Sequence, residues 1–523
     1  MTISDLDVTP DGAPWARVAG GVVRGHSEDG IATYKGIPYG APTGGANRWR
    51  PPLPPAPWEG VRDATAFGPM CPQLFGAPLE EETAVLQRGP MSEDCLYLNI
   101  WAPSDAAKTP RPVMVWFHGG AYSIGSAASA STDGAHLARE QGVVVVTVNH
   151  RLNLFGFLDV QAWGGDEYAD SGNVGMLDCV AALAWVRDNI AAFGGNPDSV
   201  TIFGHSGGGF KVMTLMAMPA AKGLFHRAIA QSGFALTANT PDVAADLARQ
   251  AIGRLEKPAS TIEELLEVSA EDLVGVLEAS PGLVFALAPV VDGAILPHQP
   301  FTPDAPALSA DIPMLVGSTE TEITFLPFAP LDPISDGELH QHLKQYTALG
   351  DDDLEDLTRV YRNAYPDHDN THLYQVLASD WLLGADAIVT AERKAADGRA
   401  PVYLYYFTKY AGARGGKLRS VHTIDVAYVF NTLDRAPVVG TPTGDDRILA
   451  ERMGRTWAAF ARTGDPNNDA IPAWPRYDLT ERHVMTIDRQ WVVTGDPRSR
   501  TRAAMAQMKA KAAQSMRDLA TQD

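Results

Sequence analysis

The sequence predicts an α/β fold, with a central, mostly parallel β-sheet and helices on both of its faces. Short runs of β-branched residues alternate with longer segments of helical periodicity, the order expected when a crossover helix joins each pair of parallel strands. The strand candidates are also apolar almost throughout rather than at every second position. Strands that are buried on both faces have this composition.

The individual elements follow from these two patterns. Between the second and third strand candidates, apolar residues recur at helical spacing over residues 175–192, which predicts a helix that packs on the sheet. Strands are predicted at residues 113–117, 143–149, 200–204, 228–231, 314–317 and 402–407.

Other parts of the chain are expected to lie around this core. The part before about residue 110 is rich in Gly and Pro, which predicts turns and short strands that wrap the sheet edge. Acidic helical patterns at about 240–285 and 330–400 indicate insertions, and residues 498–523 indicate a surface helix. Because no repeat or linker divides the chain, we expect residues 1–523 to form a single domain.

Composition excludes several classes of function. The formal net charge of -21 predicts a surface that repels nucleic acids and anionic lipids. The amino-terminal residues lack a signal-peptide pattern and no long apolar run follows, so we expect a cytoplasmic protein without a membrane insertion. Three cysteines without a CxxC pair give no support for a metal site, and no cofactor is predicted.

A candidate nucleophile lies in residues 204–208, Gly-His-Ser-Gly-Gly. This segment follows a predicted strand directly and precedes a helix-compatible run, which is the context in which G-x-S-x-G indicates a catalytic serine. The flanking glycines allow the sharp turn that leaves the hydroxyl projecting. Ser206 is therefore the predicted nucleophile, and a turn without catalytic role is the alternative.

The segment His-Gly-Gly-Ala at residues 118–121 leaves another buried strand. Glycine loops of this kind turn backbone N–H groups toward the oxyanion that forms during acyl transfer. The predicted donors are the N–H groups of Gly120, Ala121 and Gly207, the last of which follows the nucleophile. A glycine turn with no catalytic role is again the alternative.

A serine nucleophile needs a histidine as base and a carboxylate that fixes the imidazole tautomer, in the chain order serine, acid, histidine. Of the downstream histidines, only His422 follows closely on a strong strand candidate through a glycine-bearing loop. Glu320 and Glu322 both follow the strand predicted at 314–317, and spacing alone does not separate them. The competing histidines are His340, His342, His368, His372 and His483.

The nucleophile segment, the His-Gly-Gly-Ala loop and residues 93–101 (EDCLYLNIW) together resemble the type-B carboxylesterase and cholinesterase family of α/β-hydrolases. The likeness extends from about residue 20 to about residue 490 and includes GIPYG, NHRLNLFGFL and PVVDG. The resemblance implies an α/β-hydrolase fold with helical insertions over an active-site gorge. It also implies a serine carboxylesterase similar to the bacterial p-nitrobenzyl esterases.

The resemblance also implies roles for individual residues. The family's acid stands five residues after the strand-end glycine, which is Glu322 when counted from Gly317, although Thr321 and Ile323 depart from the usual aspartate and glycine. The family's histidine matches His422, three residues before Asp425. Further matches are Gly119 and Ser232, which would support the catalytic residues without reacting, a structural ion pair of Arg48 with Glu93, and a disulfide between Cys71 and Cys95, whose oxidation state the sequence leaves open.

Substrate preference is indicated by only a few positions. Val85 stands where cholinesterases carry the tryptophan that binds choline, so choline esters are not expected as preferred substrates. Phe285 matches an acyl-pocket position, and Leu283 replaces an aromatic residue there; ordinary core positions are the alternative. We expect hydrolysis of a small ester through an acyl-enzyme. Carbamates, amides or polyester oligomers are alternative substrates, and a non-catalytic binding protein is the alternative class. The oligomeric state is not predicted.

Overall fold

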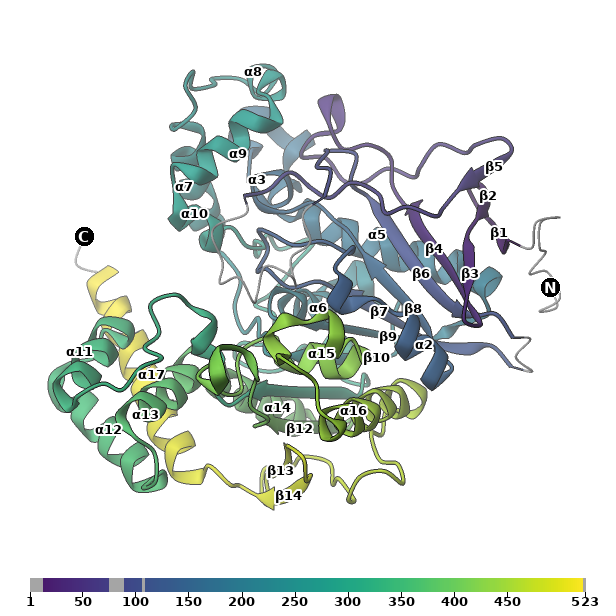
Figure 1. The fold of residues 1–523 in the computed structure, drawn as a ribbon. Helices are drawn as coiled ribbons and strands as arrows, with labels where there is room; N and C mark the ends of the chain where they lie inside the picture. Colours follow the sequence, from purple (N-terminus) through teal and green to yellow (C-terminus); the bar gives the residue numbers. More distant parts are fainter. Residues whose placement is uncertain (1–12, 75–88, 106–108, 521–523) are drawn as a thin grey trace.

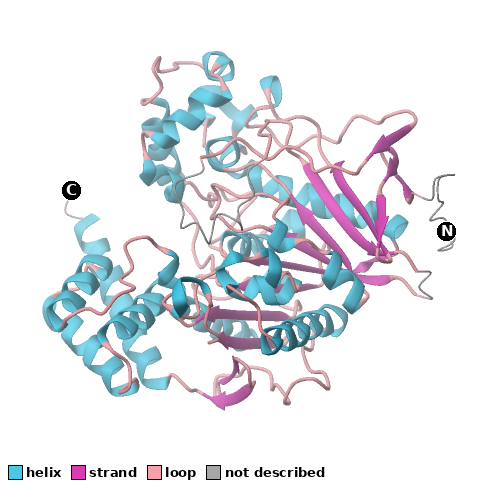
Figure 2. Ribbon diagram, viewed as in Figure 1, coloured by secondary structure: helices cyan, strands magenta, loops and turns pink. Residues whose placement is uncertain are grey.

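A computed structural model describes residues 13–74, 89–105 and 109–520. Figure 1 shows a large twisted sheet at the centre, and Figure 2 shows helices on both sides of it. The strands of this sheet run in the order β14-β13-β12-β11-β10-β9-β7-β8-β6-β4-β3. Their bounds are β3 His26–Glu28, β4 Ile31–Pro38, β6 Tyr97–Pro103, β7 Arg111–Phe117, β8 Val144–Val148, β9 Gly195–His205, β10 Arg227–Gln231, β11 Met314–Thr319, β12 Val402–Phe407, β13 His483–Ile487 and β14 Val492–Gly495.

The seven strands from β8 through β13 in this order pair in parallel, and the strands at both edges pair antiparallel. All six strands predicted from the sequence are present in the parallel part, within a few residues of their expected bounds. The predicted α/β fold with a mostly parallel sheet is therefore confirmed.

Alternate residues along the strands enter two separate cores, which explains why the strands lack polar positions. In β7, Val115 and Phe117 enter one core, while Met114 and Trp116 enter the other. Helices α5 and α6 pack on the first core, and α2, α15 and α16 pack on the second. The bounds are α2 Ala135–Gln141, α3 Asn153–Phe157, α4 Gln161–Gly164, α5 Val174–Asn189, α6 Gly207–Ala217, α15 Ile424–Phe430 and α16 Gly444–Thr463.

The amino-terminal part differs from the prediction. It does not only wrap the edge of the sheet, because β3, β4 and β6 extend the sheet by three antiparallel strands. A further small sheet has the order β1-β2-β5, with bounds Trp15–Val18, Gly21–Arg24 and Val61–Asp63. Strand β6 is buried along its whole length. This core strand was not predicted, because the segments around it are rich in Gly and Pro.

The two helical regions expected outside the core form two separate groups in Figure 1. The second group and α17 have a small core of their own, which includes Ile323, Leu354, Leu377 and Met505. Among the described residues no helix is long and apolar enough to cross a membrane. The first group contains α7 Pro241–Ile252, α8 Ile262–Glu267, α9 Ala270–Glu278 and α10 Pro281–Ala286; the second contains α11 Asp336–Thr347, α12 Asp351–Ala364 and α13 Asn370–Ser379, and α17 spans Ser499–Ala520. Helix α14, Ala385–Asp397, lies instead on the sheet beside β11 and β12, and its Ala387, Ile388 and Ala391 belong to the main core.

Candidate active site

Ser206 occupies the turn between β9 and α6, as the sequence predicts. Its backbone has φ 56° and ψ -124°, a strained conformation for a residue with a side chain. The turn is possible because glycines surround it: a Cβ on Gly208 would lie 1.9 Å from the carbonyl oxygen of Phe117, and a Cβ on Gly233 would lie 1.9 Å from that of Ser206. Ser206 itself is partly exposed at the carboxyl end of the sheet.

The loop of residues 118–121 lies directly against this turn. A Cβ on Gly207 would meet backbone atoms of Ala121 at 2.1–2.5 Å, and a Cβ on Gly119 would lie 3.5 Å from the Cβ of Ser206. Gly120 and Ala121 both have positive φ, 93° and 52°. In the described part of the chain their N–H groups donate no hydrogen bond, and the N–H of Gly207 opens α6, where helical N–H groups have no intrahelical partner. The three predicted oxyanion donors therefore lie together beside Ser206.

Glu322 and His422 form a buried pair. Nδ1 of His422 lies 2.5 Å from Oε2 of Glu322, and their side chains are 4% and 0% exposed. The other oxygen, Oε1, accepts a hydrogen bond from the backbone N–H of Thr319 at 2.7 Å. This arrangement fixes the imidazole with Nδ1 toward the carboxylate and leaves Nε2 as the available base.

The loops that carry this pair are tied together and to α13. Glu322 begins a short 3-10 helix, Glu322–Phe325. Thr321 donates from its backbone to Ser420 and from its hydroxyl to Leu418, and Ile323 donates to the hydroxyl of Ser379 at 3.0 Å. Ile323 is fully buried in the core of α11, α12 and α13. These contacts account for the two residues that depart from the family pattern around the acid.

His422 is held near the nucleophile turn by contacts between their neighbours. The backbone N–H of Thr423 donates to Nε2 of His205 at 3.2 Å, and the rings of His205 and His422 lie 4.3 Å apart. Burial, and secondarily the charge of His422, lowers the pKa of His205 well below its ordinary value. His205 therefore stays neutral and accepts this hydrogen bond, which joins the residue before Ser206 to the residue after His422.

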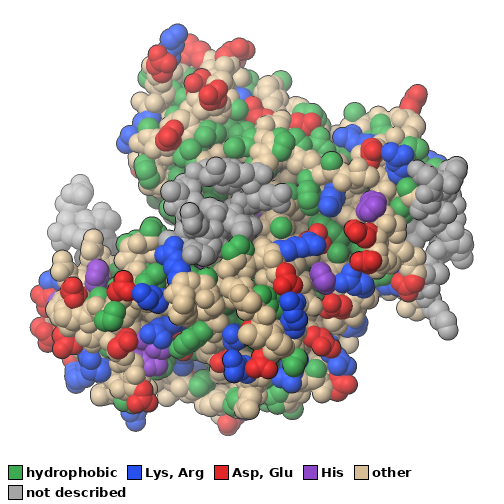
Figure 3. Space-filling model, in the orientation of Figure 1, with side chains coloured by type: hydrophobic (Ala, Val, Ile, Leu, Met, Phe, Trp, Pro, Cys, Tyr) green, Lys and Arg blue, Asp and Glu red, His purple; other side chains and the backbone are tan. Residues whose placement is uncertain are grey.

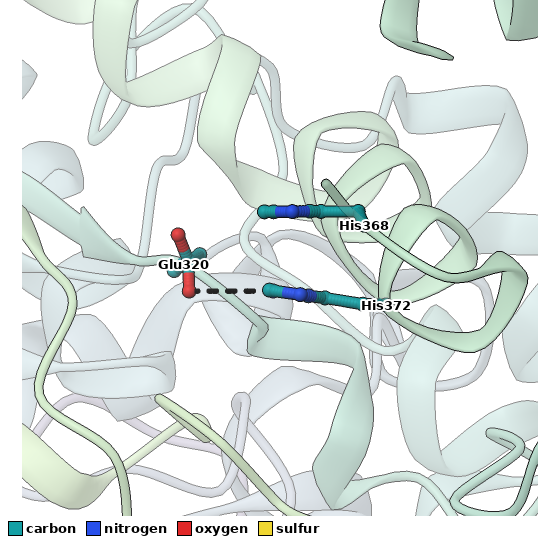
Figure 4. Close-up of side chains that lie close together, drawn as sticks. All are labelled: Glu320, His368 and His372. Atoms are coloured by element: carbon teal, nitrogen blue, oxygen red, sulfur yellow. Dashed lines mark ion pairs between the residues drawn. The ribbon is translucent and has the colours of Figure 1, made fainter. Parts of the chain in front are cut away.

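Glu320, the alternative acid, lies in a different place. Figure 4 shows it facing His368 and His372, and one of its oxygens lies 3.6 Å from Nε2 of His372. The two imidazoles stack with centroids 3.5 Å apart and planes 9° apart. In Figure 4 both rings point toward Glu320, one above the other, and one ligand atom from each of the three residues lies within 4.8 Å of the other two, a spacing that could hold a metal ion. The remaining competitors, His340, His342 and His483, belong to α11 and β13.

Asp425 is a buried residue at the site whose role sequence reasoning missed. Its Oδ2 accepts hydrogen bonds from Tyr405 at 2.8 Å and from Gln231 at 3.0 Å, and burial raises the pKa of its carboxyl to about 6. The only signal in the sequence is its spacing from His422.

Ser232 follows Gln231 directly, is fully buried, has positive φ, and donates its backbone N–H to Gly317. This hydrogen bond ties the segment beside the nucleophile turn to β11, the strand that leads to Glu322.

The remaining predicted positions are distributed as follows. Arg48 and Glu93 form the expected ion pair at 2.5 Å. Cys71 and Cys95 are adjacent buried free thiols. Leu283 is buried in the main core, whereas Phe285 is 79% exposed, and the acyl pocket stays a prediction. Val85 lies outside the described residues.

Comparisons with known proteins agree with this geometry. Residues 12–510 match the Carboxylesterase family. The chain is 36% identical over 490 residues to the para-nitrobenzyl esterase of Bacillus subtilis (strain 168), covering 92% of this chain and 96% of that protein. A carboxylesterase of Geobacillus stearothermophilus has a similar structure (TM-score 0.79, 34% identity, 94% and 99% coverage). So does an esterase of anaerobic Clostridium hathewayi described as able to hydrolyze aliphatic aromatic polyesters (TM-score 0.81, 34% identity, 96% and 99% coverage).

Proposed function

This chain belongs to the carboxylesterase family and is a carboxylic-ester hydrolase, and from this premise we propose that Ser206, His422 and Glu322 carry out its reaction. The observation that carries the assignment is the buried contact of His422 with Glu322 on loops that adjoin the strained turn of Ser206. Glu320 is excluded from this role in the proposal because its carboxylate faces His372.

The reaction proceeds by acyl transfer in two steps. Nε2 of His422 takes the proton of the Ser206 hydroxyl as its oxygen attacks the ester carbonyl, and the resulting imidazolium is stabilised by Glu322. The oxyanion accepts hydrogen bonds from Gly120, Ala121 and Gly207. Collapse of the intermediate breaks the bond to the alcohol, which leaves with the proton from His422. Water then attacks the acyl-enzyme with the same base, and the carboxylic acid and free Ser206 result.

The test is the substitution S206A, measured with p-nitrophenyl butyrate. We expect hydrolysis to fall by at least about 1000-fold, because the nucleophile is lost while the oxyanion donors remain, and the circular dichroism spectrum to stay unchanged. S104A is the control, because Ser104 is an exposed serine directly after β6 whose hydroxyl contacts that of Ser27, and it should retain the wild-type activity. Turnover by S206A at the wild-type rate would refute the assignment.

The ester itself is proposed only as a class. The polyester-hydrolysing relative and the para-nitrobenzyl esterase differ in what their names say they act on, although they share the fold with this chain. Comparing kcat/KM over esters that vary separately in acyl and alcohol size, together with a matched carbamate and amide, would identify the preferred class, because pocket shape sets this ratio.

A further inference from the structure

A buried lysine on α6 has no role in the reaction described above. Lys211 lies five residues after Ser206, and its side chain is fully buried. Its Nζ donates to two backbone carbonyls, that of Ala121 at 2.7 Å and that of His118 at 3.2 Å. In the described part of the chain no carboxylate forms an ion pair with it. A lysine in such a place lowers stability, because burying an unpaired charge is costly.

The two carbonyls held by Lys211 flank the peptide groups that carry the predicted oxyanion donors. Between them, the carbonyl of Gly119 faces Nδ1 of His118 at 2.9 Å, and that of Gly120 accepts from Ser123 and Ile124 at 3.1 and 3.0 Å. All four carbonyls of residues 118–121 thus have a polar partner. A peptide group whose carbonyl is fixed on one side presents its N–H to the opposite side.

The loop conformation is one that needs such support. Ala121 has φ 52°, a left-handed conformation that is strained for an L-residue with a side chain. The contact of Lys211 with Ala121 is the shorter of its two hydrogen bonds. Burial lowers the pKa of Lys211 to about 7, and its amino group keeps N–H donors for the carbonyls in either protonation state. The two carbonyls belong to the peptide groups on either side of those that carry the N–H groups of Gly120 and Ala121, so the lysine fixes this segment at both ends.

The groups around Lys211 do not replace this contact. The Tyr122 ring centroid lies 5.6 Å from Nζ, and His118 stacks on His150 at 4.9 Å. Burial, followed by the charge of Lys211, lowers the pKa of His118 to about 3 and that of His150 well below its ordinary value. Burial raises the pKa of the Cys179 thiol, and also that of Tyr122. These four neighbours are therefore neutral near pH 7, and among the described residues the hydrogen bonds of Lys211 go to backbone carbonyls.

We propose that Lys211 is a positioning residue for the oxyanion hole: it holds the carbonyls of His118 and Ala121 so that the N–H groups of Gly120 and Ala121 point at the tetrahedral intermediate. This inference rests on the proposed function of the loop. It explains why a fully buried lysine is placed on the helix that begins at the nucleophile.

The test compares K211M, which keeps the length and apolar stem of lysine but removes its donors, with wild type. We expect kcat for p-nitrophenyl butyrate to fall about 10- to 100-fold with KM changed by less than about 3-fold, since misdirected donors weaken transition-state binding. The affinity for a trifluoromethyl ketone, whose serine adduct places an oxyanion in the hole, should fall by a similar factor. If Lys211 had a purely structural role, K211M would change the thermal stability and leave kcat and the inhibitor affinity unchanged.

The matched control is K394M. Lys394 is also buried and also donates to two carbonyls, those of Ser309 and Ala310 at 3.0 and 2.6 Å, but on α14 away from the loop. This variant removes the same buried amino group and should keep the wild-type kcat and inhibitor affinity. Equal losses of kcat in K211M and K394M would overturn the inference.

K211Q provides the second variant if K211M does not fold. Glutamine is shorter than lysine and reaches at most one carbonyl, so kcat and inhibitor affinity should fall at least about 5-fold. Wild-type values in K211M or K211Q overturn the role of Lys211. Labelling of wild-type Ser206 by a fluorophosphonate separates this failure from failure of the proposed function, because an unlabelled wild type would refute the proposed function itself.

Discussion

Asp425 is a buried acid whose titration can be measured through the pH dependence of the free energy of unfolding. Burial raises the pKa of its carboxyl from 3.8 to about 6, although Gln231 and Tyr405 donate hydrogen bonds that oppose the shift. Between these two values the folded state binds more protons than the unfolded state. The stabilisation is therefore fully present below about pH 3.8 and is lost as the pH rises through about 6.

Substitution of Asp425 by asparagine should remove this dependence. Relative to D425N, the free energy of unfolding of the wild type should fall by on the order of 3 kcal/mol between pH 4 and pH 7. Urea denaturation of both proteins across this range measures the difference. Parallel stability curves for the two proteins would show that Asp425 does not titrate in this interval.

The two glutamates after β11 should differ strongly in their effect on catalysis. E322Q keeps the size of the side chain but removes the charge that stabilises the imidazolium, so kcat should fall about 1000- to 10 000-fold. E320Q should leave kcat nearly unchanged, because Glu320 faces His372 and not His422. Steady-state kinetics with p-nitrophenyl butyrate distinguishes them, and a greater loss in E320Q would reverse the assignment.

The strand and loop pattern predicted Ser206 and His422 through the strands that precede them, but it did not separate Glu320 from Glu322, which only the family resemblance did. That choice depends on where β11 ends. Strand pairing continues to Thr319, and the carboxylate of Glu322, three residues after Thr319, turns back to accept the N–H of Thr319. Lys211 was beyond prediction for a related reason: lysine in a helix is usually solvated, and only the packing shows that this one is buried.

At the scale of elements, a buried ion pair connects α5 to the segment after β8. The Arg151 guanidinium donates to both carboxylate oxygens of Asp178 at 2.7 and 2.8 Å, and the side chains are 1% and 0% exposed. Removing one partner from a pair of this kind leaves the other charge buried and unpaired.

D178N should therefore lower the free energy of unfolding by about 3–5 kcal/mol. D63N is the control, since Arg24 and Asp63 form an exposed pair with side chains 41% and 55% exposed, and should change stability by less than about 1 kcal/mol. The shift of the urea midpoint tests both. Equal shifts of the urea midpoint in D178N and D63N would mean that the buried pair of Arg151 and Asp178 stabilises the fold no more than the exposed pair does.

The predicted strands share one physical property, which is continuous burial on both faces of a parallel sheet. Strands that lack it were missed. At one edge β13 contains half-buried positions and β14 exposed ones, and β4 is interrupted by a register shift between Tyr34 and Ile37. The helical groups were visible because their amphipathic periodicity is strong, whereas the way they fix Ile323, and thereby Glu322, depends on tertiary packing.

For the whole molecule, the formal charge of -21 bears on partners more than on mechanism. Figure 3 shows acidic and basic side chains interspersed on the visible face, with no continuous basic surface there. The expected absence of nucleic-acid partners and the cytoplasmic location stay predictions. Family membership and ester hydrolysis are shown by similarity over nearly the whole chain, and they agree with what the residues alone indicate.

The proposed reaction depends on Ser206 as the nucleophile and on His422 as the base that activates it. Its most direct test is the mass of the peptide that contains Ser206 after brief exposure of the whole protein to a fluorophosphonate. We predict a single phosphonyl adduct on Ser206, absent from S206A and formed at least about 100-fold more slowly in H422A, because the serine then lacks its base. An adduct on another residue, or equal labelling of S206A, would contradict this assignment.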